Sequence, residues 1–257
     1  MTATVKTARA WQPVRDDVER KGQTLGFVPT MGALHQGHRS LIEQSLAEND
    51  RTVVSIFVNA AQFNDPDDLT DYPRPLGEDR AALEDLGVDY LFLPDHDTIY
   101  PDGYRYKLVE SELSRVLCGA HRPGHFDGVL TVVMRLLNII RPHRAYFGEK
   151  DFQQYQLVKE MAEAFFLRVE IRPCPIVRDP DGVALSSRNV LLSADGRALA
   201  AEFARILADG DSPTAVRAAL NERGITAEYV EEMFDRRLAA VVIDGVRLID
   251  NVPLLGP

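Results

Sequence analysis

Short apolar segments alternate along the chain with longer segments that have helical periodicity. The short ones are rich in Val, Ile and aromatic residues and are bounded by Gly, Pro or Asp, which is typical of buried β-strands. On this pattern we predict strands at 25–30, 52–58, 88–94, 145–148 and 169–177.

Three intervening segments carry mainly apolar residues on one helical face. The positions of these faces are 41, 42, 45 and 46; 129, 132, 133, 136, 137 and 140; and 152, 155, 158, 161, 162 and 165. Alternating strands and helices predict βαβ units, and hence a Rossmann-like, doubly wound, mainly parallel sheet of the α/β class. Such sheets bind ligands beyond the carboxyl ends of their strands, so the segments after each strand are the candidates for chemistry.

The pattern changes after residue 177. Two Ala-rich helices are predicted at 194–208 and 213–223, followed by strand-like segments at 227–234 and 238–250. We therefore predict two domains, a Rossmann-like domain over 1–177 and a smaller, shortened α+β domain over 178–257.

Composition narrows the possible functions. The 257-residue chain has a formal net charge of −10, which argues against general nucleic-acid binding because that depends on Lys and Arg neutralising phosphates. Acidic residues concentrate in the segment 65–71, which is predicted to be a flexible solvated loop, with a lid as a second possibility. The chain shows no signal-peptide pattern and no apolar run of membrane-spanning length, so we expect a cytoplasmic protein that does not enter a membrane.

The two cysteines, Cys118 and Cys174, lack metal-binding spacing and lie in apolar surroundings. We expect both to be inert packing residues.

The strongest candidate for chemistry follows the first predicted strand. There the sequence Pro-Thr-Met-Gly-Ala-Leu-His-Gln-Gly-His-Arg-Ser at 29–40 leads into a helix. A helix N-terminus offers free N–H groups and the positive end of the dipole, both of which favour an anion. His35 and His38 add two side-chain donors at the same turn.

Further candidates follow other strands. Gln62 and Gln154 offer amides suited to a carboxylate and hydroxyls, and Lys150 is a mobile charge suited to a phosphate. Asp151 beside it is a candidate partner for Mg²⁺. Ser186, Ser187 and Arg188 place two hydroxyls and a guanidinium together near the predicted domain boundary.

The segment 29–40 resembles the phosphate-binding signature of the nucleotidyltransferase superfamily. The complete string from residue 29 to residue 40 is more specific, and it is similar to the pantothenate synthetase (pantoate–β-alanine ligase) family. Five further stretches carry the same resemblance across the chain, namely VSIFVNAAQF at 54–63, RPGHFDGV at 122–129, FGEKDFQQ at 147–154, DGVALSSRN at 181–189 and RLIDN at 247–251.

The resemblance implies an ATP-dependent ligation with Mg²⁺, in which pantoate is adenylated and then joined to β-alanine, with release of AMP and pyrophosphate. It implies that His35, His38, Lys150, Ser186, Ser187 and Arg188 stabilise the phosphates, that Gln62 and Gln154 hold pantoate and β-alanine, and that the protein is a homodimer. Residues implied to border ATP are Met31, Gly32, Ala33, Leu34, His35, Gln36, Gly37, His38, Gly148, Glu149, Lys150, Asp151, Val177, Leu185, Ser186, Ser187 and Arg188. Arg122 and His125 are equally well explained as residues that support the site and as residues that contact a ligand.

Two departures from the family pattern keep alternatives open. Ala60 stands where a proline usually follows the Asn59 equivalent, which loosens the turn before Gln62. The connection after residue 234 is short, which puts closure of the 186–188 segment over ATP in doubt. The alternatives are another adenylyl-transferring enzyme, for which the test is whether AMP release needs β-alanine, and a non-catalytic ATP-binding relative.

Overall fold

The computed structural model describes residues 1–254, and these form two compact units. Unit 1 comprises Met1–Glu149 and Gln153–Cys174, and unit 2 comprises Lys150–Phe152 and the chain from Pro175 onward. The last residues of the predicted second domain, 255–257, lie outside the described residues. Each unit is described separately below.

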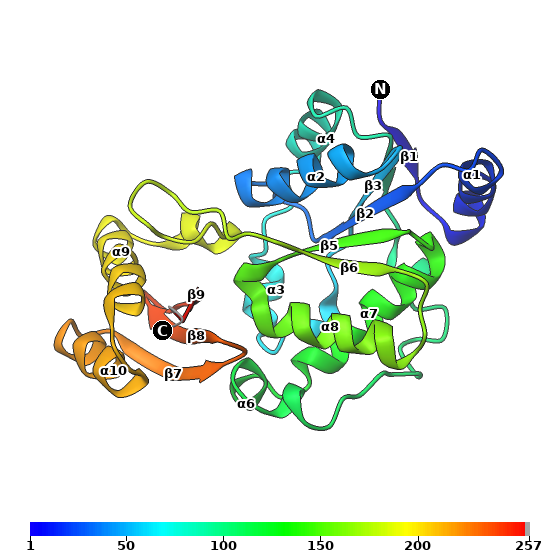
Figure 1. The fold of residues 1–257 in the computed structure, drawn as a ribbon. Helices are drawn as coiled ribbons and strands as arrows, with labels where there is room; N and C mark the ends of the chain where they lie inside the picture. Colours follow the sequence, from blue (N-terminus) through cyan, green and yellow to red (C-terminus); the bar gives the residue numbers. More distant parts are fainter. Residues whose placement is uncertain (255–257) are drawn as a thin grey trace. The chain divides into compact units, whose positions relative to one another are not determined.

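Unit 1 is built on a six-stranded parallel sheet with the strand order β1-β4-β3-β2-β5-β6 (Figure 1). The strands are β1 (Ala3–Val5), β2 (Leu25–Thr30), β3 (Arg51–Ile56), β4 (Tyr90–Phe92), β5 (Arg144–Gly148) and β6 (Glu170–Cys174). The predicted doubly wound parallel sheet is therefore confirmed. Sequence analysis missed β1, because three residues are too few to show a periodicity, and it extended β3, β4 and β6 beyond their ends.

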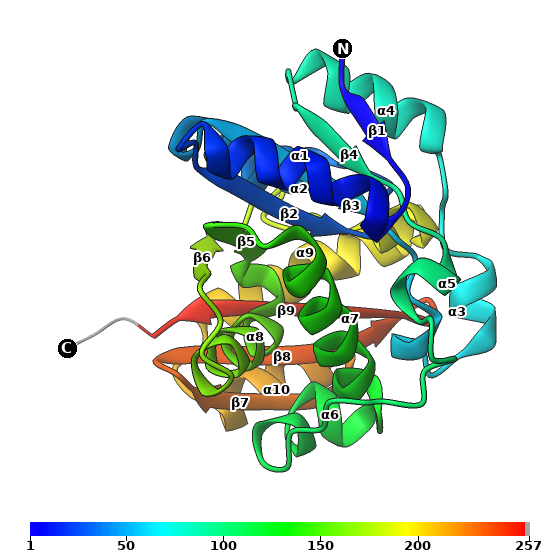
Figure 2. The same ribbon diagram turned by 90° about the vertical axis from the view of Figure 1, so that its right-hand side faces the viewer.

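Helices cover both faces of this sheet, as right-handed βαβ connections require (Figures 1 and 2). The helices α2 (Gln36–Glu48) and α4 (Leu76–Asp85) pack on one face, where Ile42 and Leu83 join a buried cluster with Val28 and Val54. The other face carries α1 (Ala8–Arg20), α7 (His125–Ile140) and α8 (Phe152–Ala164). The shorter helices are α3 (Pro66–Thr70), α5 (His96–Ile99), α6 (Cys118–His121), and the 3-10 turns η1 (Ala60–Gln62), η2 (Leu113–Arg115), η3 (Glu149–Asp151) and η4 (Ser187–Leu191).

Two local predictions in unit 1 are wrong. The acidic segment 65–71 is not simply a loop, because Pro66–Thr70 forms α3, with the Asp65 carboxylate accepting a hydrogen bond from the N–H of Asp67 at 2.9 Å. An N-cap Asp followed by Pro is a strong helix start even in a polar sequence. Phe165 does not join the buried face of α8, because the helix ends at Ala164 and the Phe165 side chain is 57% exposed.

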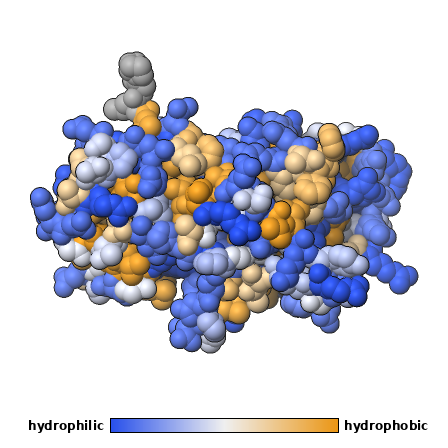
Figure 3. All heavy atoms as spheres, turned by 90° about the horizontal axis from the view of Figure 1, so that it is seen from below, coloured by the Kyte–Doolittle hydropathy of each residue, from blue (hydrophilic) through white to orange (hydrophobic). Residues whose placement is uncertain are grey.

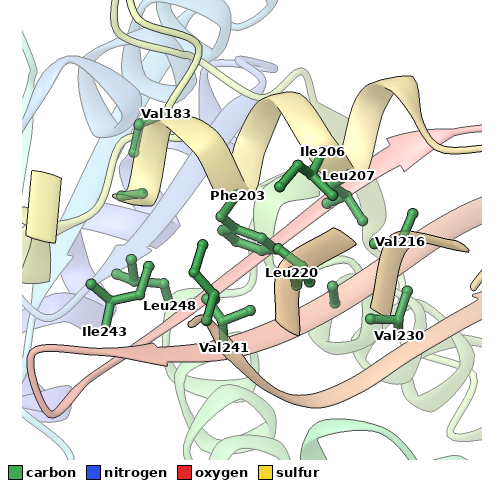
Figure 4. Packing of buried hydrophobic residues seen from close by; sticks show 13 residues of the cluster. Val183, Phe203, Ile206, Leu207, Val216, Leu220, Val230, Val241, Ile243 and Leu248 are labelled. Carbon is green, nitrogen blue, oxygen red and sulfur yellow. The ribbon is translucent and has the colours of Figure 1, made fainter. Parts of the chain in front are cut away.

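Unit 2 contains an antiparallel three-stranded sheet of β7 (Thr226–Met233), β8 (Arg236–Ile243) and β9 (Val246–Pro253). Side chains from α9 (Ala194–Asp209) and α10 (Pro213–Glu222), including Phe203, Leu207 and Leu220, pack on its inner face with Val241 and Leu248 (Figure 4). The two helices are confirmed nearly to the residue. The single strand predicted over 238–250 is in fact two strands.

Both hairpins of this sheet have two-residue turns with positive φ at each central residue. Phe234 and Asp235 have φ of 59° and 55°, and Asp244 and Gly245 have φ of 54° and 76°. This is the twist that two-residue hairpins favour, although Gly or Asn usually supplies it. The second turn carries the Asp-Gly dipeptide that is typical of such hairpins, so the strand predicted over 238–250 ran through a turn signal that the sequence contains.

The surface is mixed rather than apolar. Hydrophilic side chains cover much of the face shown in Figure 3, with hydrophobic ones interspersed. Over residues 1–254, no helix combines the length and apolar character needed to span a bilayer.

Candidate active site

The order of the strands identifies the edge of the sheet at which a ligand is expected. From β2 the chain proceeds to β3 and β4 on one side, whereas β5 and β6 lie on the other side. The strand order therefore reverses between β2 and β5, which pair directly through Phe27 and Ala145. Ligands of doubly wound sheets bind at the carboxyl ends beside such a reversal. The segments after β2 and β5 are the two that carry the predicted histidines and lysine.

The loop after β2 is fixed by a buried carboxylate. Gly32 and Ala33 both have positive φ, at 85° and 52°, and the side chain of Asp79 accepts hydrogen bonds from the N–H groups of Ala33 at 3.0 Å and Leu34 at 2.8 Å. A Cβ on Gly32 would lie 2.9 Å from Asp79 Oδ2, so a larger residue would displace the carboxylate. Only 3% of Asp79 is exposed.

Sequence analysis missed Asp79, although a signal was present. In α4 it lies three residues after Leu76 and four before Leu83, which places it on the buried face of the helix. An acidic residue on such a face needs hydrogen-bond donors close by.

The two histidines form a reciprocal cap at the start of α2. The Nδ1 atom of His35 accepts from the N–H of Gly37 at 3.1 Å, and the Nδ1 atom of His38 accepts from the N–H of His35 at 3.4 Å. Their ring centroids are 4.1 Å apart. Because Nδ1 accepts in both, each neutral ring carries its proton on Nε2 and can donate from that edge.

This capping uses part of the backbone that was expected to be free for an anion. The N–H groups of Ala33 and Leu34 are bonded to Asp79, and those of His35 and Gly37 are bonded to the imidazoles. Phosphate binding by the start of α2 and by the two histidines stays a prediction.

Gln62 is held from several sides within unit 1. Its Oε1 accepts from Asn59 Nδ2 at 2.9 Å, and its Nε2 donates to the sulfur of Met31 at 3.4 Å, which places the side chain beside the loop after β2. Asn59 is buried, and its Oδ1 accepts from the hydroxyl of Tyr100 at 2.6 Å. Burial raises the pKa of Tyr100, so this hydroxyl stays a donor.

The backbone around Gln62 is also constrained. A Cβ on Gly128 would lie 2.3 Å from the carbonyl oxygen of Ala61, so only glycine permits α7 to approach η1 this closely. The carbonyl oxygen of Gln62 interacts with Nδ1 of His125 at 2.8 Å and accepts from Arg122 at 3.3 Å. Arg122 and His125 thus support Gln62, and these contacts hold the turn that Ala60 was expected to loosen.

The two adjacent glutamines of α8 differ in their surroundings. Gln154, the residue predicted to hold substrate, is half-buried in the first turn. Gln153 is buried, with its amide donating to the carbonyl oxygens of Leu113 and Val116 and accepting from the N–H of Cys118. Gln153 is therefore a structural residue, and the sequence prediction had named only its neighbour Gln154 as a substrate ligand.

The remaining predicted phosphate ligands belong to unit 2. Lys150 lies in η3, with its Nζ 3.9 Å from Oδ2 of Asp151. Ser186 caps η4, its hydroxyl accepting from the N–H of Arg188 at 3.2 Å. Leu185 donates its N–H to the carbonyl oxygen of Val177 at 3.0 Å, so these two predicted ATP-bordering residues are adjacent.

The residues present do not form a preformed metal site. Asp151 is a half-exposed carboxylate beside a lysine, and among the residues that the structure describes no group of three or more His, Cys, Asp or Glu is arranged to hold a metal. Such a residue suits an ion that arrives with a triphosphate, because Mg²⁺ commonly combines one or two carboxylates with substrate phosphates and water.

Both cysteines are buried and neither is part of a disulfide. Burial raises the pKa of the Cys174 thiol to about 12, so it remains protonated and is a poor nucleophile.

Comparison with known proteins identifies the family to which this chain is similar over its whole length. The family model for pantoate-beta-alanine ligase matches residues 1–253. A pantothenate synthetase of Bdellovibrio bacteriovorus is 47% identical over 99% of this chain and 100% of its own length, and one of Coxiella burnetii is 48% identical over 98% and 97%. A crystal structure of pantoate-beta-alanine ligase from Francisella tularensis, complexed with beta-gamma ATP and beta-alanine, aligns with a TM-score of 0.93 at 41% identity over the full length of both chains.

These matches correct one expectation. Because the relatives are covered over 97% to 100% of their length, the C-terminal region is not shortened with respect to them.

Proposed function

The chain belongs to the pantoate-beta-alanine ligase family, and on that premise we propose that it joins pantoate to β-alanine in an ATP-dependent, AMP-forming reaction. The observation that carries the assignment within the structure is the reciprocal His35–His38 cap. It presents two Nε2–H donors at the strand-order reversal of a chain matched over its whole length by this family.

The proposed chemistry has two steps. A carboxylate oxygen of pantoate attacks the α-phosphorus of ATP, the bond to the bridging oxygen breaks, and pyrophosphate leaves with pantoyl-adenylate formed. The neutral amine of β-alanine then attacks the acyl carbon, AMP leaves as the acyl C–O bond breaks, and the nitrogen loses a proton. Adenylation is needed because a bare carboxylate has no acceptable leaving group.

The task of the protein in this scheme is alignment and charge stabilisation. We propose that the negative charge that develops on the phosphates is stabilised by His35, His38, Lys150 and the Ser186–Arg188 segment. Gln62 and Gln154 are assigned to pantoate, and Gln62 also to β-alanine. The fixed surroundings of Gln62 support its assignment, since they hold its amide with Oε1 accepting and Nε2 donating.

Three finer points belong to the same proposal. The nucleotide substrate is the Mg²⁺ complex of ATP, with Asp151 as the carboxylate nearest to it. The protein acts in the cytoplasm, where ATP is supplied. It works as a homodimer, which family resemblance supports and which sedimentation at several concentrations tests.

Exchange of labelled pyrophosphate into ATP isolates the first half-reaction. We expect exchange that requires pantoate and does not require β-alanine, together with AMP release that requires both. Pyrophosphate release with the AMP moiety transferred to an acceptor, and therefore without free AMP, would favour another adenylyl-transferring reaction. ATP binding without pantoate-dependent exchange would identify a non-catalytic nucleotide-binding protein.

A further inference from the structure

The segment RLIDN at 247–251 has no role in the proposed chemistry, yet two of its residues are among the most buried polar groups of unit 2. Asn251 is 1% exposed and Asp250 is 4% exposed. Both lie in β9. Asn251 is hydrogen-bonded to Lys150, a candidate phosphate ligand, and Asp250 is hydrogen-bonded to Arg178, in the turn that leads to Ser186.

Asn251 holds the backbone of Lys150. Its Nδ2 donates to the carbonyl oxygen of Lys150 at 3.1 Å, and its Oδ1 accepts from Nε of Arg236. The Arg236 guanidinium in turn lies 4.7 Å from the ring centroid of Phe152, and the Phe234 ring lies 6.0 Å from the same ring. The three residues Lys150–Phe152 therefore contact the small sheet, and they belong to unit 2 although Phe152 is the first residue of α8.

Asp250 holds the segment that leads to Ser186. Its carboxylate accepts two hydrogen bonds from Arg178, at 2.6 Å and 2.9 Å. Arg178 also donates to the carbonyl oxygen of Gly182 and forms a bridge with Ala184, so it closes the short turn whose far arm ends at Ser186.

The two anchors are joined to each other. The backbone N–H of Asn251 donates to Oδ1 of Asp250 at 2.7 Å, and the carbonyl oxygen of Asn251 accepts from Arg178 at 3.2 Å. Because both residues are buried, their hydrogen bonds have little room to relax. A change at either residue therefore disturbs the other.

We propose that Asp250 and Asn251 are positioning residues that set the placement of Lys150 relative to the Ser186–Arg188 segment. This inference rests on the proposed function, because it assigns both segments to the phosphates of ATP. Lys150 and Ser186 are far apart in sequence, and β9 is the element that contacts the backbone of one and the supporting turn of the other.

The test uses the full-length protein and the pantoate-dependent pyrophosphate exchange. Asn251→Ala removes the donor to Lys150, and Asn251→Asp removes it while keeping the side-chain volume. We expect each to lower the maximal exchange rate about 10- to 100-fold, the scale for misplacing a catalytic group, with the KM for pantoate changed less than about twofold. Arg247→Gln is the matched control, since Arg247 lies on the same strand but pairs with Glu228.

A double-mutant cycle distinguishes positioning from a general structural role. In a Lys150→Ala background, Asn251→Ala should cost less than about twofold, because the group that it positions is already gone. An equal cost in both backgrounds would overturn the proposal, as would near-normal exchange in both Asn251 variants.

Hydrogen–deuterium exchange gives a readout that does not depend on activity. Peptides covering 149–153 should exchange faster in Asn251→Ala than in the parent chain and in Arg247→Gln, and unchanged protection would refute the anchoring role. Failure of the proposed function is seen separately, because the parent chain itself would then show no pantoate-dependent exchange.

Discussion

Each unit uses one buried aspartate to hold a candidate phosphate-binding segment, but the two aspartates are satisfied in different ways. In unit 1, Asp79 accepts from the backbone N–H groups of Ala33 and Leu34, so it acts on consecutive residues of one loop. In unit 2, Asp250 accepts two hydrogen bonds from Arg178, so it joins β9 to a turn that is distant in sequence.

The difference follows from how the candidate phosphate-binding residues of the two units are arranged along the sequence. The loop of unit 1 is contiguous, and His35 and His38 cap each other within four residues, so a single carboxylate suffices to fix it. Lys150 and Ser186–Arg188 are separate segments, and holding them together requires a side-chain network on β9. A contiguous site tolerates loss of a distant residue better than a dispersed site does.

The largest expected effect tests whether the two regions contribute equally to turnover. His38→Ala in unit 1 and Lys150→Ala in unit 2 should each lower β-alanine-dependent AMP release by roughly 10²–10³-fold, the scale for loss of one transition-state donor. The exposed residues His96 and Lys159 provide matched controls as alanine variants. Near-normal activity in both His38→Ala and Lys150→Ala would refute the assigned roles.

The next effect concerns the stability of unit 2. Arg178→Ala leaves the Asp250 carboxylate buried without its cation, so the free energy of unfolding should fall by about 3 kcal/mol. Denaturant titration followed by circular dichroism measures this. Arg205→Ala, which removes an exposed ion pair with Glu202, should cost less than about 1 kcal/mol. Equal losses in the two variants would show that Asp250 is not a critical anchor.

A smaller effect is expected for the corresponding carboxylate of unit 1. Asp79→Ala leaves the N–H groups of Ala33 and Leu34 without their acceptor, at a cost of about 2 kcal/mol in stability, and the KM for ATP should rise. Asp79→Asn keeps one acceptor oxygen, so its stability and its KM for ATP should lie between those of the parent chain and those of Asp79→Ala. Glu84→Ala, an exposed change in the same helix, is the control. An unchanged KM for ATP in Asp79→Ala would show that the loop after β2 does not contribute to nucleotide binding.

The smallest effect tests the close approach of α7 to Gln62. Gly128→Ala places a methyl group against the carbonyl of Ala61 and should shift η1, raising the KM for pantoate roughly fivefold, or about 1 kcal/mol. Steady-state kinetics at saturating ATP measure it, with Asn138→Ala on the exposed part of α7 as control. A larger effect on the KM for ATP than for pantoate would contradict the assignment of Gln62.

The sequence by itself determined the α/β class, the two Ala-rich helices, the strands β2 to β7 within three residues at each end, and the contiguous His35–His38 motif. These features depend on local periodicity and on neighbouring residues, which a linear pattern records directly. Motif order along the whole chain also carried the family resemblance, and the full-length match to pantoate-beta-alanine ligases confirms it.

Tertiary structure decided what depends on contacts between distant segments. It showed that Asp79 occupies the donors of the histidine loop, that Gln153 supports the fold whereas Gln154 remains half-buried, and that Asn251 holds Lys150. A buried polar residue is stable only with its partners in place, and those partners come from parts of the chain that no local pattern brings together.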